Sequence, residues 1–277
     1  MFLHKNYISE RVETMKQVQN KWALITGASS GIGEAFAHEL AAKGSHLILT
    51  ARSESKLVAL AEKLSKKHGI QTEVIVSDLS REGSPAKLYQ ECLKRGLSVD
   101  ILINNAGFAS HGLFDQLSRD RVHEEVMLNV LAVVDLTHLF LPDILKKQSG
   151  IVINVASTAA FQPDPYMAVY GATKAFVLSF TQSLWEENRK RGVQFLALCP
   201  GSTETPFFSV VGAEEASVGK RDTPENVVQV ALRSLEAGRP YAVAGFKNFI
   251  TAQASRFLTS KQMLRIVERM LRPRVLL

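Results

Sequence analysis

Seven short apolar segments rich in β-branched residues recur along most of the chain. Their nearly continuous hydrophobicity indicates strands that are buried on both faces, and the intervals between them are long enough for helices, as in parallel βαβ units. The predicted strands are residues 22–26, 46–50, 72–76, 101–104, 151–155, 194–198 and 241–245. This alternation predicts an α/β fold built on a doubly wound, seven-stranded parallel sheet.

Segments with helical periodicity fill the intervals between the strands. The predicted helices are residues 31–43, 53–67, 86–95, 119–138, 167–191 and 224–235. No repeat, low-complexity stretch or Pro/Gly/Ser-rich linker divides the chain. We therefore predict one domain over residues 21–246, with an amino-terminal appendage, residues 1–20, and a carboxyl-terminal extension, residues 247–277. Translation could start at Met1 or at Met15.

The composition excludes several classes of protein. A chain of 277 residues that is 46% hydrophobic and 22% charged is typical of a soluble globular protein. Cys92 and Cys199 lie far apart, so we expect neither a disulfide framework nor a metal site. Charges at Lys5, Glu10 and Arg11 argue against a signal peptide, and no apolar run suggests a membrane span. These features favour a cytoplasmic location.

The positive charge is concentrated at one end of the chain. The net charge is +6. Residues 247–277 contain seven Lys or Arg and one acid, Glu268, so this extension carries the whole excess and the rest is neutral. We therefore expect no nucleic-acid partner for the main domain.

A glycine-rich turn follows the first predicted strand in LITGASSGIGEAFAHEL. Gly27 permits a tight turn, Gly31 lets the backbone approach a pyrophosphate, and Gly33 allows the helix to pack against the strand. The spacing is G-x-x-x-G-x-G rather than G-x-G-x-x-G, and three glycines could form only a turn. Their place between a strand and a helix favours a Rossmann-type dinucleotide site. The predicted contacts are Gly27, Ser29, Ser30, Gly31, Ile32 and Gly33.

The residues that follow the second and third predicted strands indicate which coenzyme binds. A carboxylate at the end of the second strand would select NAD, but Ala51 stands there and Arg52 follows it. This favours NADP(H), although Arg52 could also be a solvated arginine at a helix start. Asp78, after the third strand, could meet the adenine amino group or simply cap a turn.

Polar motifs close the fourth, fifth and sixth strands, at the edge where ligands bind in open parallel sheets. They are NNAG at residues 104–107, NVAS at 154–157 and CPGSTET at 199–205. Ser157 lies on this edge, and Tyr170 and Lys174 follow one helical turn apart. A Tyr and a Lys at this spacing share a helix face and could be a surface pair. The strand-end Ser157 and the glycine-rich turn earlier in the chain favour an active site instead.

The residue types fit carbonyl reduction. A reduced nicotinamide supplies hydride, and a side chain must supply a proton to oxygen. The Tyr170 phenol could do so if the Lys174 ammonium lowered its pKa, while Ser157 held the substrate oxygen. Lys174 could also hold the cofactor ribose.

In order and spacing, TGASSGIG, NNAG, Ser157, YGATK and PGSTET resemble the classical short-chain dehydrogenase/reductase family over roughly residues 21–245. With NADP(H) as the expected cofactor, the resemblance implies a homodimer or homotetramer formed through the long helices. It implies catalytic roles for Asn129, Ser157, Tyr170 and Lys174; residue chemistry alone makes Asn129 a helix-interior asparagine. It implies cofactor contacts at Asn105, Ala106, Gly107, Tyr170, Lys174, Pro200, Gly201 and Thr205, with Asn105 near the adenosine ribose and Thr205 near the carboxamide.

One position departs from the family pattern. Many NADP(H)-dependent members have a basic residue just before the second glycine, where this chain has Ser30. The NADP(H) prediction therefore depends mainly on Arg52.

The expected substrate is an apolar carbonyl compound or alcohol. Phe108, residues 159–167, Phe207 and Phe208 are the expected cleft lining. The run YGATKAFVLSFTQSLWEEN is similar to the branch of long-chain 3-oxoacyl reductases and hydroxysteroid dehydrogenases. Two alternatives stay open: a sugar-directed isomerase or dehydratase, which would usually be longer, and an NADP(H)-binding redox sensor without turnover.

The carboxyl-terminal extension alternates apolar and basic residues at helical spacing. Met263, Ile266, Val267 and Met270 are expected on one side of this helix. The helix could pack on the core or on another subunit. It could instead be a basic amphipathic lid or make weak contact with a membrane surface.

Overall fold

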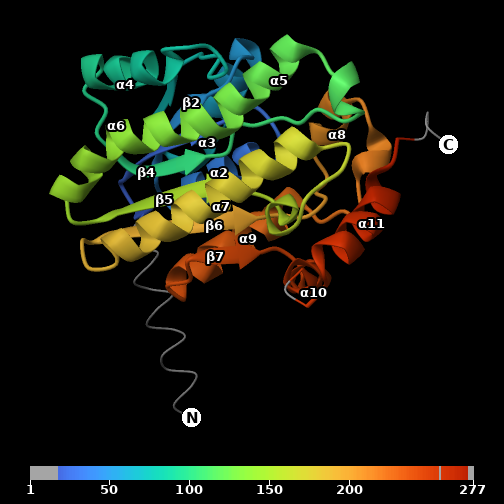
Figure 1. The fold of residues 1–277 in the computed structure, drawn as a ribbon. Helices are drawn as coiled ribbons and strands as arrows, with labels where there is room; N and C mark the ends of the chain where they lie inside the picture. The colour runs from blue at the N-terminus through green and yellow to red at the C-terminus, as the bar shows by residue number, and fades with distance from the viewer. Residues whose placement is uncertain (1–17, 256, 274–277) are drawn as a thin grey trace.

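The computed structural model describes residues 18–255 and 257–273. Its centre is a parallel sheet of seven strands, as the sequence predicts, and their order is β3-β2-β1-β4-β5-β6-β7 (Figure 1). The strands are β1 (Trp22–Thr26), β2 (His46–Thr50), β3 (Thr72–Val74), β4 (Val99–Asn104), β5 (Gly150–Val155), β6 (Val193–Cys199) and β7 (Tyr241–Val243). The order reverses between β1 and β4, which creates the crevice where such sheets bind ligands.

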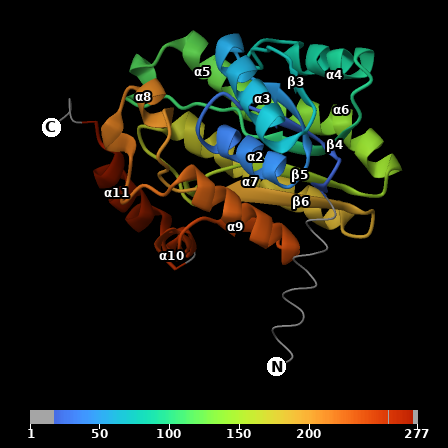
Figure 2. The same cartoon turned by 180° about the vertical axis from the view of Figure 1, so that it is seen from behind.

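Three helices cover one face of the sheet: α2 (Gly31–Ala42), α3 (Glu54–His68) and α9 (Pro224–Glu236) (Figure 2). Phe36 and Leu40 of α2 are buried in one cluster with Leu57 of α3 and Val227 of α9. Val18 is buried in the same cluster, so the chain already packs on the domain before residue 20. This burial fixes the start of α2 against β1 and thus positions the glycine turn.

The opposite face is covered by α4 (Ser84–Lys94), α5 (Arg119–Val126), α6 (Ala132–Lys146) and α7 (Ala168–Asn188). A π-helical turn, η2 (Met127–Leu131), joins α5 to α6. The sequence predicted that the helix starting at Arg119 ends at residue 138. This prediction is wrong, because the helix continues to Lys146. Pro142 lies inside α6 without ending it, because Phe140 and Ile144 on either side are buried against the sheet.

The helix from Arg119 to Lys146 is also long and apolar enough, by length and composition, to cross a membrane. The sequence predicted no apolar run of membrane-spanning length, and length and composition alone do not show that this helix crosses a membrane. A helix that covers a buried sheet has the same length and composition as a membrane span. Here Val133, Leu136 and Phe140 pack into the core of the domain.

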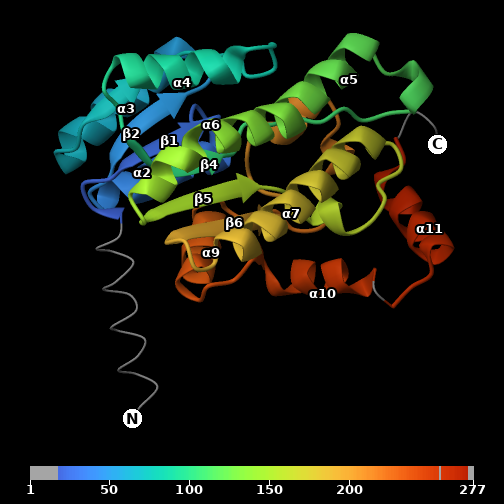
Figure 3. The same ribbon diagram turned by 60° about the vertical axis from the view of Figure 1, so that its left-hand side comes forward.

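The carboxyl-terminal part packs on the domain near the carboxyl ends of the strands (Figure 3). It contains α10 (Phe246–Ala254) and α11 (Ser260–Leu271). Short elements complete the fold: α8 (Phe207–Val211) and the 3₁₀ turns η1 (Phe114–Gln116), η3 (Thr158–Phe161) and η4 (Glu214–Ala216). The buried side of α11 is Met263, Val267 and Leu271. The predicted grouping is therefore wrong for Ile266 and Met270, which are exposed, because the buried stripe follows a spacing of four and turns around the helix away from them.

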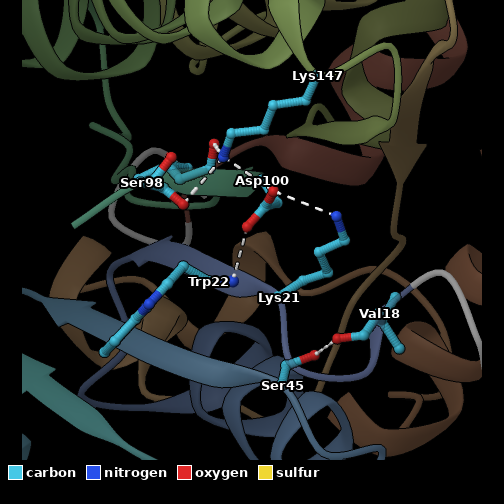
Figure 4. A network of polar contacts seen from close by, with 8 residues as sticks. Val18, Lys21, Trp22, Ser45, Ser98, Asp100 and Lys147 are labelled. Atoms are coloured by element: carbon cyan, nitrogen blue, oxygen red, sulfur yellow. Dashed lines mark hydrogen bonds and ion pairs between the residues drawn. The ribbon is translucent and has the colours of Figure 1, made fainter.

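A polar network ties the strands together at their amino ends (Figure 4). Asp100 of β4 accepts hydrogen bonds from the backbone N–H of Trp22 at 3.0 Å and from the Lys147 ammonium at 2.9 Å. Lys21 lies 3.6 Å from the same carboxylate. Beside it, the Ser45 hydroxyl donates to the Val18 carbonyl at 2.7 Å. The carboxylate and the ammonium groups in this network therefore have partners.

Candidate active site

Apart from Asn129, the predicted site residues lie on loops and helix starts at the carboxyl edge of the sheet. The glycine turn joins β1 to α2, and Arg52 and Asp78 follow β2 and β3. The predicted cofactor contacts at residues 105–107 and 200–205 follow β4 and β6, and Ser157 follows β5. Tyr170 and Lys174 enter from the first turns of α7. The sheet thus brings residues that are distant in sequence to one edge.

The glycine turn has the close packing that a dinucleotide cradle requires. Gly27 and Gly31 have positive φ values of 65° and 59°. A Cβ on Gly27 would lie 2.8 Å from Asn105 Nδ2, and a Cβ on Gly31 would lie 2.8 Å from Thr205 Cγ2. Within the described residues, no side chain caps the start of α2 at Ser30. The free N–H groups of this helix start fit a phosphate.

Arg52 and Asp78 lie at the far end of this crevice. Arg52 is exposed just after β2 and contributes to lowering the Asp78 pKa. Asp78 Oδ1 accepts hydrogen bonds from the Ser80 backbone at 3.1 Å and from its hydroxyl at 2.7 Å. Asp78 therefore caps a turn here, and its contact with adenine stays a prediction. Arg81, 3.5 Å from Asp78 Oδ2, is a second cation that sequence reasoning did not single out.

The NNAG motif has a structural part and a site-facing part. Asn105 Nδ2 donates to the Thr26 carbonyl at 2.9 Å and so braces the glycine turn. Asn104 points into the core, where its amide donates to Asn154 Oδ1 at 2.9 Å. Asn154 in turn donates to Thr181 at 2.9 Å. Sequence reasoning missed this buried chain, although an asparagine in each of two adjacent apolar strands was a visible signal.

Tyr170 and Lys174 meet as their spacing predicts. The Lys174 ammonium lies 5.6 Å from the centre of the Tyr170 ring and donates to the Val155 carbonyl at 2.8 Å. The Ser157 hydroxyl accepts a hydrogen bond from the Ala159 N–H at 3.1 Å, which leaves its own proton to be donated. Lys174 is buried, so the pair is not surface decoration.

Burial dominates the protonation of this pair. It lowers the pKa of Lys174 to about 8, which leaves the ammonium mostly charged at neutral pH. Burial also raises the pKa of the Tyr170 phenol, and the Ser157 hydroxyl opposes this only partly. The expected lowering of the Tyr170 pKa by Lys174 is therefore not found. Removing both groups from water penalises both charged forms.

Asn129 lies in the π-helical turn η2, and its side chain faces the loop after β4 and helix α7. Its amide donates to the Phe108 carbonyl at 2.8 Å and to Thr173 at 3.2 Å, and its oxygen accepts from the Phe108 N–H at 3.2 Å. A Cβ on Gly107 would lie 2.9 Å from Asn129 Oδ1 and 3.5 Å from the Lys174 nitrogen. Gly107 therefore lets the loop after β4 approach Asn129 and Lys174.

Two buried carboxyl groups near the catalytic residues were missed. Glu125, one turn before Asn129, is fully buried, and burial raises its pKa to about 7. Neither of its oxygens has a well-formed hydrogen bond within the described residues, although Ser110 is close enough to lower the pKa. Burial likewise raises the pKa of Asp164 to about 6. No local sequence signal distinguishes the buried Glu125 from the partly exposed Glu124 beside it.

An apolar wall adjoins Tyr170. The Phe207 ring centre lies 5.5 Å from that of Tyr170, and Phe208 packs edge-on against Phe207 at 5.3 Å. Met263 and Val267 from the inner side of α11 join the same cluster. The predicted lining by Phe207 and Phe208 therefore lies beside the reacting phenol. A hollow of about 550 Å³ between α3 and β3 contains none of these residues.

Two polar contacts anchor α11 over this wall. The Tyr166 hydroxyl donates to Glu268 Oε1 at 2.9 Å, and the Tyr166 backbone has a positive φ of 65°. His111 Nε2 lies 2.7 Å from the Leu271 carbonyl. The extension thus forms part of the site. Within the described residues, no group of three or more His, Cys, Asp or Glu could hold a metal ion.

Known proteins are similar to this chain in sequence. A very-long-chain 3-oxoacyl-CoA reductase of Anas platyrhynchos is 31% identical over 217 residues, 76% of this chain and 67% of that protein. The inactive hydroxysteroid dehydrogenase-like protein 1 of Homo sapiens is 31% identical over 195 residues, 70% of this chain and 58% of that protein. This chain thus matches about three fifths to two thirds of the length of these curated relatives.

A solved structure and a family model agree with them. The structure of a short-chain dehydrogenase from Sphingobium yanoikuyae in complex with NADPH superposes with a TM-score of 0.78 at 30% identity. The match covers 86% of this chain and 93% of that one. The model of the short chain dehydrogenase family matches residues 21–216, from the first strand to beyond α7. The chain is therefore a member of the short-chain dehydrogenase family.

Proposed function

We propose that this protein is an NADP(H)-dependent oxidoreductase that interconverts an apolar ketone or aldehyde and its alcohol. The observation that carries this proposal is the meeting of Ser157, Tyr170 and the buried Lys174 ammonium at the sheet edge beside an apolar wall. The glycine turn at the start of α2 fits the pyrophosphate of a dinucleotide.

Each residue has a distinct task in the proposed reaction. The cofactor supplies or accepts hydride when bound. Tyr170 donates its phenolic proton to the carbonyl oxygen during reduction, and it accepts the proton during oxidation. The Ser157 hydroxyl donates a hydrogen bond to the same oxygen. The Lys174 ammonium stabilises the phenolate that forms, and Asn129 holds the loop after β4 in place.

The preference for NADP(H) is supported by Arg52. Its guanidinium is exposed at the end of β2, where a 2′-phosphate can reach it, and Ala51 offers no carboxylate to repel that phosphate. Arg81 adds positive charge nearby, although it also contacts Glu124 at 3.2 Å. The NADPH complex of the Sphingobium yanoikuyae relative agrees with this preference.

The preference for an apolar substrate is supported by the wall around Tyr170. Phe207, Phe208 and the inner side of α11 place aromatic and aliphatic side chains in one cluster with Tyr170. The printed name of the duck relative, a very-long-chain 3-oxoacyl-CoA reductase, is compatible with such a substrate. A sugar would leave its hydroxyl groups without partners at this wall.

A second candidate is a sensor that binds NADP(H) without turnover. A human relative named inactive, at 31% identity, is the observation that keeps it open. The presence of Asn129, Ser157, Tyr170 and Lys174 argues against it.

The assembly and the location are also proposals. A homodimer or homotetramer through α6 and α7 is supported by exposed Leu131 and by exposed Phe176, which stacks on Phe180 at 5.8 Å. A reducing, cytoplasmic environment suits the two buried free thiols, Cys92 and Cys199.

The direct test is NADPH oxidation with aldehydes, ketones of increasing chain length, 3-oxoacyl thioesters and oxosteroids. Turnover should rise with apolar length. Tyr170→Phe should lower kcat on the order of a hundredfold or more, because only the proton donor is lost. NADPH binding, measured by fluorescence, should change little. Tight binding without turnover on any substrate would favour the sensor, and full activity of Tyr170→Phe would refute the mechanism.

The coenzyme preference has its own test. Arg52→Ala should weaken NADPH binding roughly ten- to a hundredfold, because a charge-assisted bond to the 2′-phosphate is lost, and it should leave NADH binding nearly unchanged. Lys56→Ala removes an exposed cation one turn further on and serves as the matched control. Equal losses for both coenzymes would show that Arg52 does not contact the 2′-phosphate.

A further inference from the structure

Large apolar side chains are exposed unusually often on the two carboxyl-terminal helices. Of the sixteen exposed large hydrophobic residues in the described chain, seven lie between Phe246 and Met270. Phe257 and Phe246 are 86% and 78% exposed. Phenylalanines with this much exposure are uncommon, and a contiguous group of them marks a surface that contacts something apolar.

The exposed apolar residues of α10 share one side of the helix. Phe249 and Ile250 lie three and four residues after Phe246, and Phe257 follows three residues beyond the end of the helix. The opposite side is buried through Ala252. The outward side of α10 is therefore an apolar stripe that the domain does not cover.

Helix α11 likewise has a buried side and an exposed side, and its exposed side also carries positive charge. Its inner side packs on the apolar wall of the site, while Leu264, Ile266 and Met270 are exposed. Lys261, Arg265 and Arg269 lie on the outer side between them. Helices α10 and α11 follow one another at the same end of the molecule and meet at an angle (Figures 1–3). We call their exposed residues the α10–α11 face.

The cations of this face are free to meet anions. Lys247, Lys261, Arg265 and Arg269 form no ion pair with any described residue. The single acid of α11, Glu268, is already engaged by Tyr166 and Arg272. Pairing the face with a second copy of itself would therefore bring like charges together. An anionic lipid surface offers apolar chains and opposite charge at once.

We infer that the α10–α11 face docks on an anionic lipid bilayer, with Phe246 and Phe257 among the residues that insert and the basic residues of α11 at the headgroups. The inner side of α11 meets the wall next to Tyr170, so docking would place the site beside the bilayer. This last consequence depends on the proposed function. The docking itself does not.

The test is co-sedimentation of the full chain with vesicles of phosphatidylserine and phosphatidylcholine, and with vesicles of phosphatidylcholine alone. Binding should require phosphatidylserine and weaken at high salt. The triple variant Lys261→Glu, Arg265→Glu, Arg269→Glu should bind on the order of a hundredfold more weakly. Phe246→Ser with Phe257→Ser should bind at least about tenfold more weakly, because exposed apolar area is lost.

The matched control places the same charge change on α3. Lys63→Glu, Lys66→Glu, Lys67→Glu alters exposed lysines away from the face and should bind as the natural protein does. Tyr170→Phe should also bind normally, so a failed reductase assay and a failed docking assay remain distinct. Equal loss in both charge-reversed variants would overturn the inference. So would a dimer in sedimentation velocity that Phe257→Ser dissociates, together with no vesicle binding, since the face would then join two subunits.

Discussion

The two ends of the parallel sheet handle buried charge in opposite ways. At the amino ends, Lys147 donates to the Ser98 and Val99 carbonyls and to Asp100, at 2.9–3.1 Å (Figure 4). At the carboxyl ends, Lys174 donates to a single carbonyl, that of Val155. There, Glu125 has no well-formed hydrogen bond among the described residues.

This difference separates stability from chemistry. A charge with a full set of partners is held in one place and contributes to the free energy of unfolding. A charge with few partners costs stability, and its unused bonds are available to a ligand. The protein carries this cost at the edge where parallel sheets bind their ligands. Each prediction below changes one end and leaves the other intact.

The largest effect is expected from exchanging the two lysines for methionine in turn. Lys174→Met should lower kcat on the order of a hundredfold or more, because the phenolate of Tyr170 loses its cation. The free energy of unfolding at pH 7 should not fall, since burial disfavours the charged lysine. Lys147→Met should show the reverse, with a loss of about 1–2 kcal/mol in urea unfolding and normal kcat per folded molecule. Comparable losses of kcat in Lys174→Met and Lys147→Met would show that catalysis and stability are not divided between the two ends of the sheet.

The next effect concerns Glu125 and depends on pH. Its pKa is raised from 4.5 to about 7, mainly by burial, against Ser110, Arg121 and Lys174, which lower it. The folded state therefore holds a proton that the unfolded state releases between these values. The contribution of Glu125 to the free energy of unfolding is fully present below about pH 4.5. It falls as the pH rises toward the folded-state pKa of about 7, and the total loss is roughly 3 kcal/mol.

Replacing this carboxyl group by an amide should remove that dependence. Glu125→Gln should unfold at higher urea than the natural protein at pH 8, and the difference should shrink toward pH 5. Glu124→Gln alters the neighbouring, partly exposed glutamate, which pairs with Arg81, and is the matched control. Parallel stability profiles for Glu125→Gln and the natural protein would show that Glu125 is not protonated when the chain folds.

The sequence predicts most of the fold and less of the site. Apolar strands and the glycine turn have local signatures, so the seven-stranded parallel sheet and the contact of Tyr170 with Lys174 follow from spacing. Burial is not local. The pKa of Tyr170 is raised, although a neighbouring ammonium alone would lower it, because the surrounding protein excludes water. For the same reason the buried Glu125 reads in the sequence as one more surface glutamate.

The smallest effect is expected at the amino end. The buried Ser45 hydroxyl donates to the Val18 carbonyl at 2.7 Å. Ser45→Ala should lower the free energy of unfolding by about 1 kcal/mol, because that carbonyl loses a partner in a site without water.

Ser183→Ala is the control for this change. It removes a similar bond, from the Ser183 hydroxyl to the Ser179 carbonyl at 3.0 Å, from an exposed position on α7. Its effect should stay within about 0.5 kcal/mol, because water replaces the lost partner. Both variants should keep the natural kcat per folded molecule, since neither hydroxyl lies at the carboxyl edge. A lowered kcat in Ser45→Ala alone would mean that the loss of a hydrogen bond at the amino ends of the strands disturbs the catalytic residues at the carboxyl ends. Stability and catalysis would then not be separated between the two ends of the sheet.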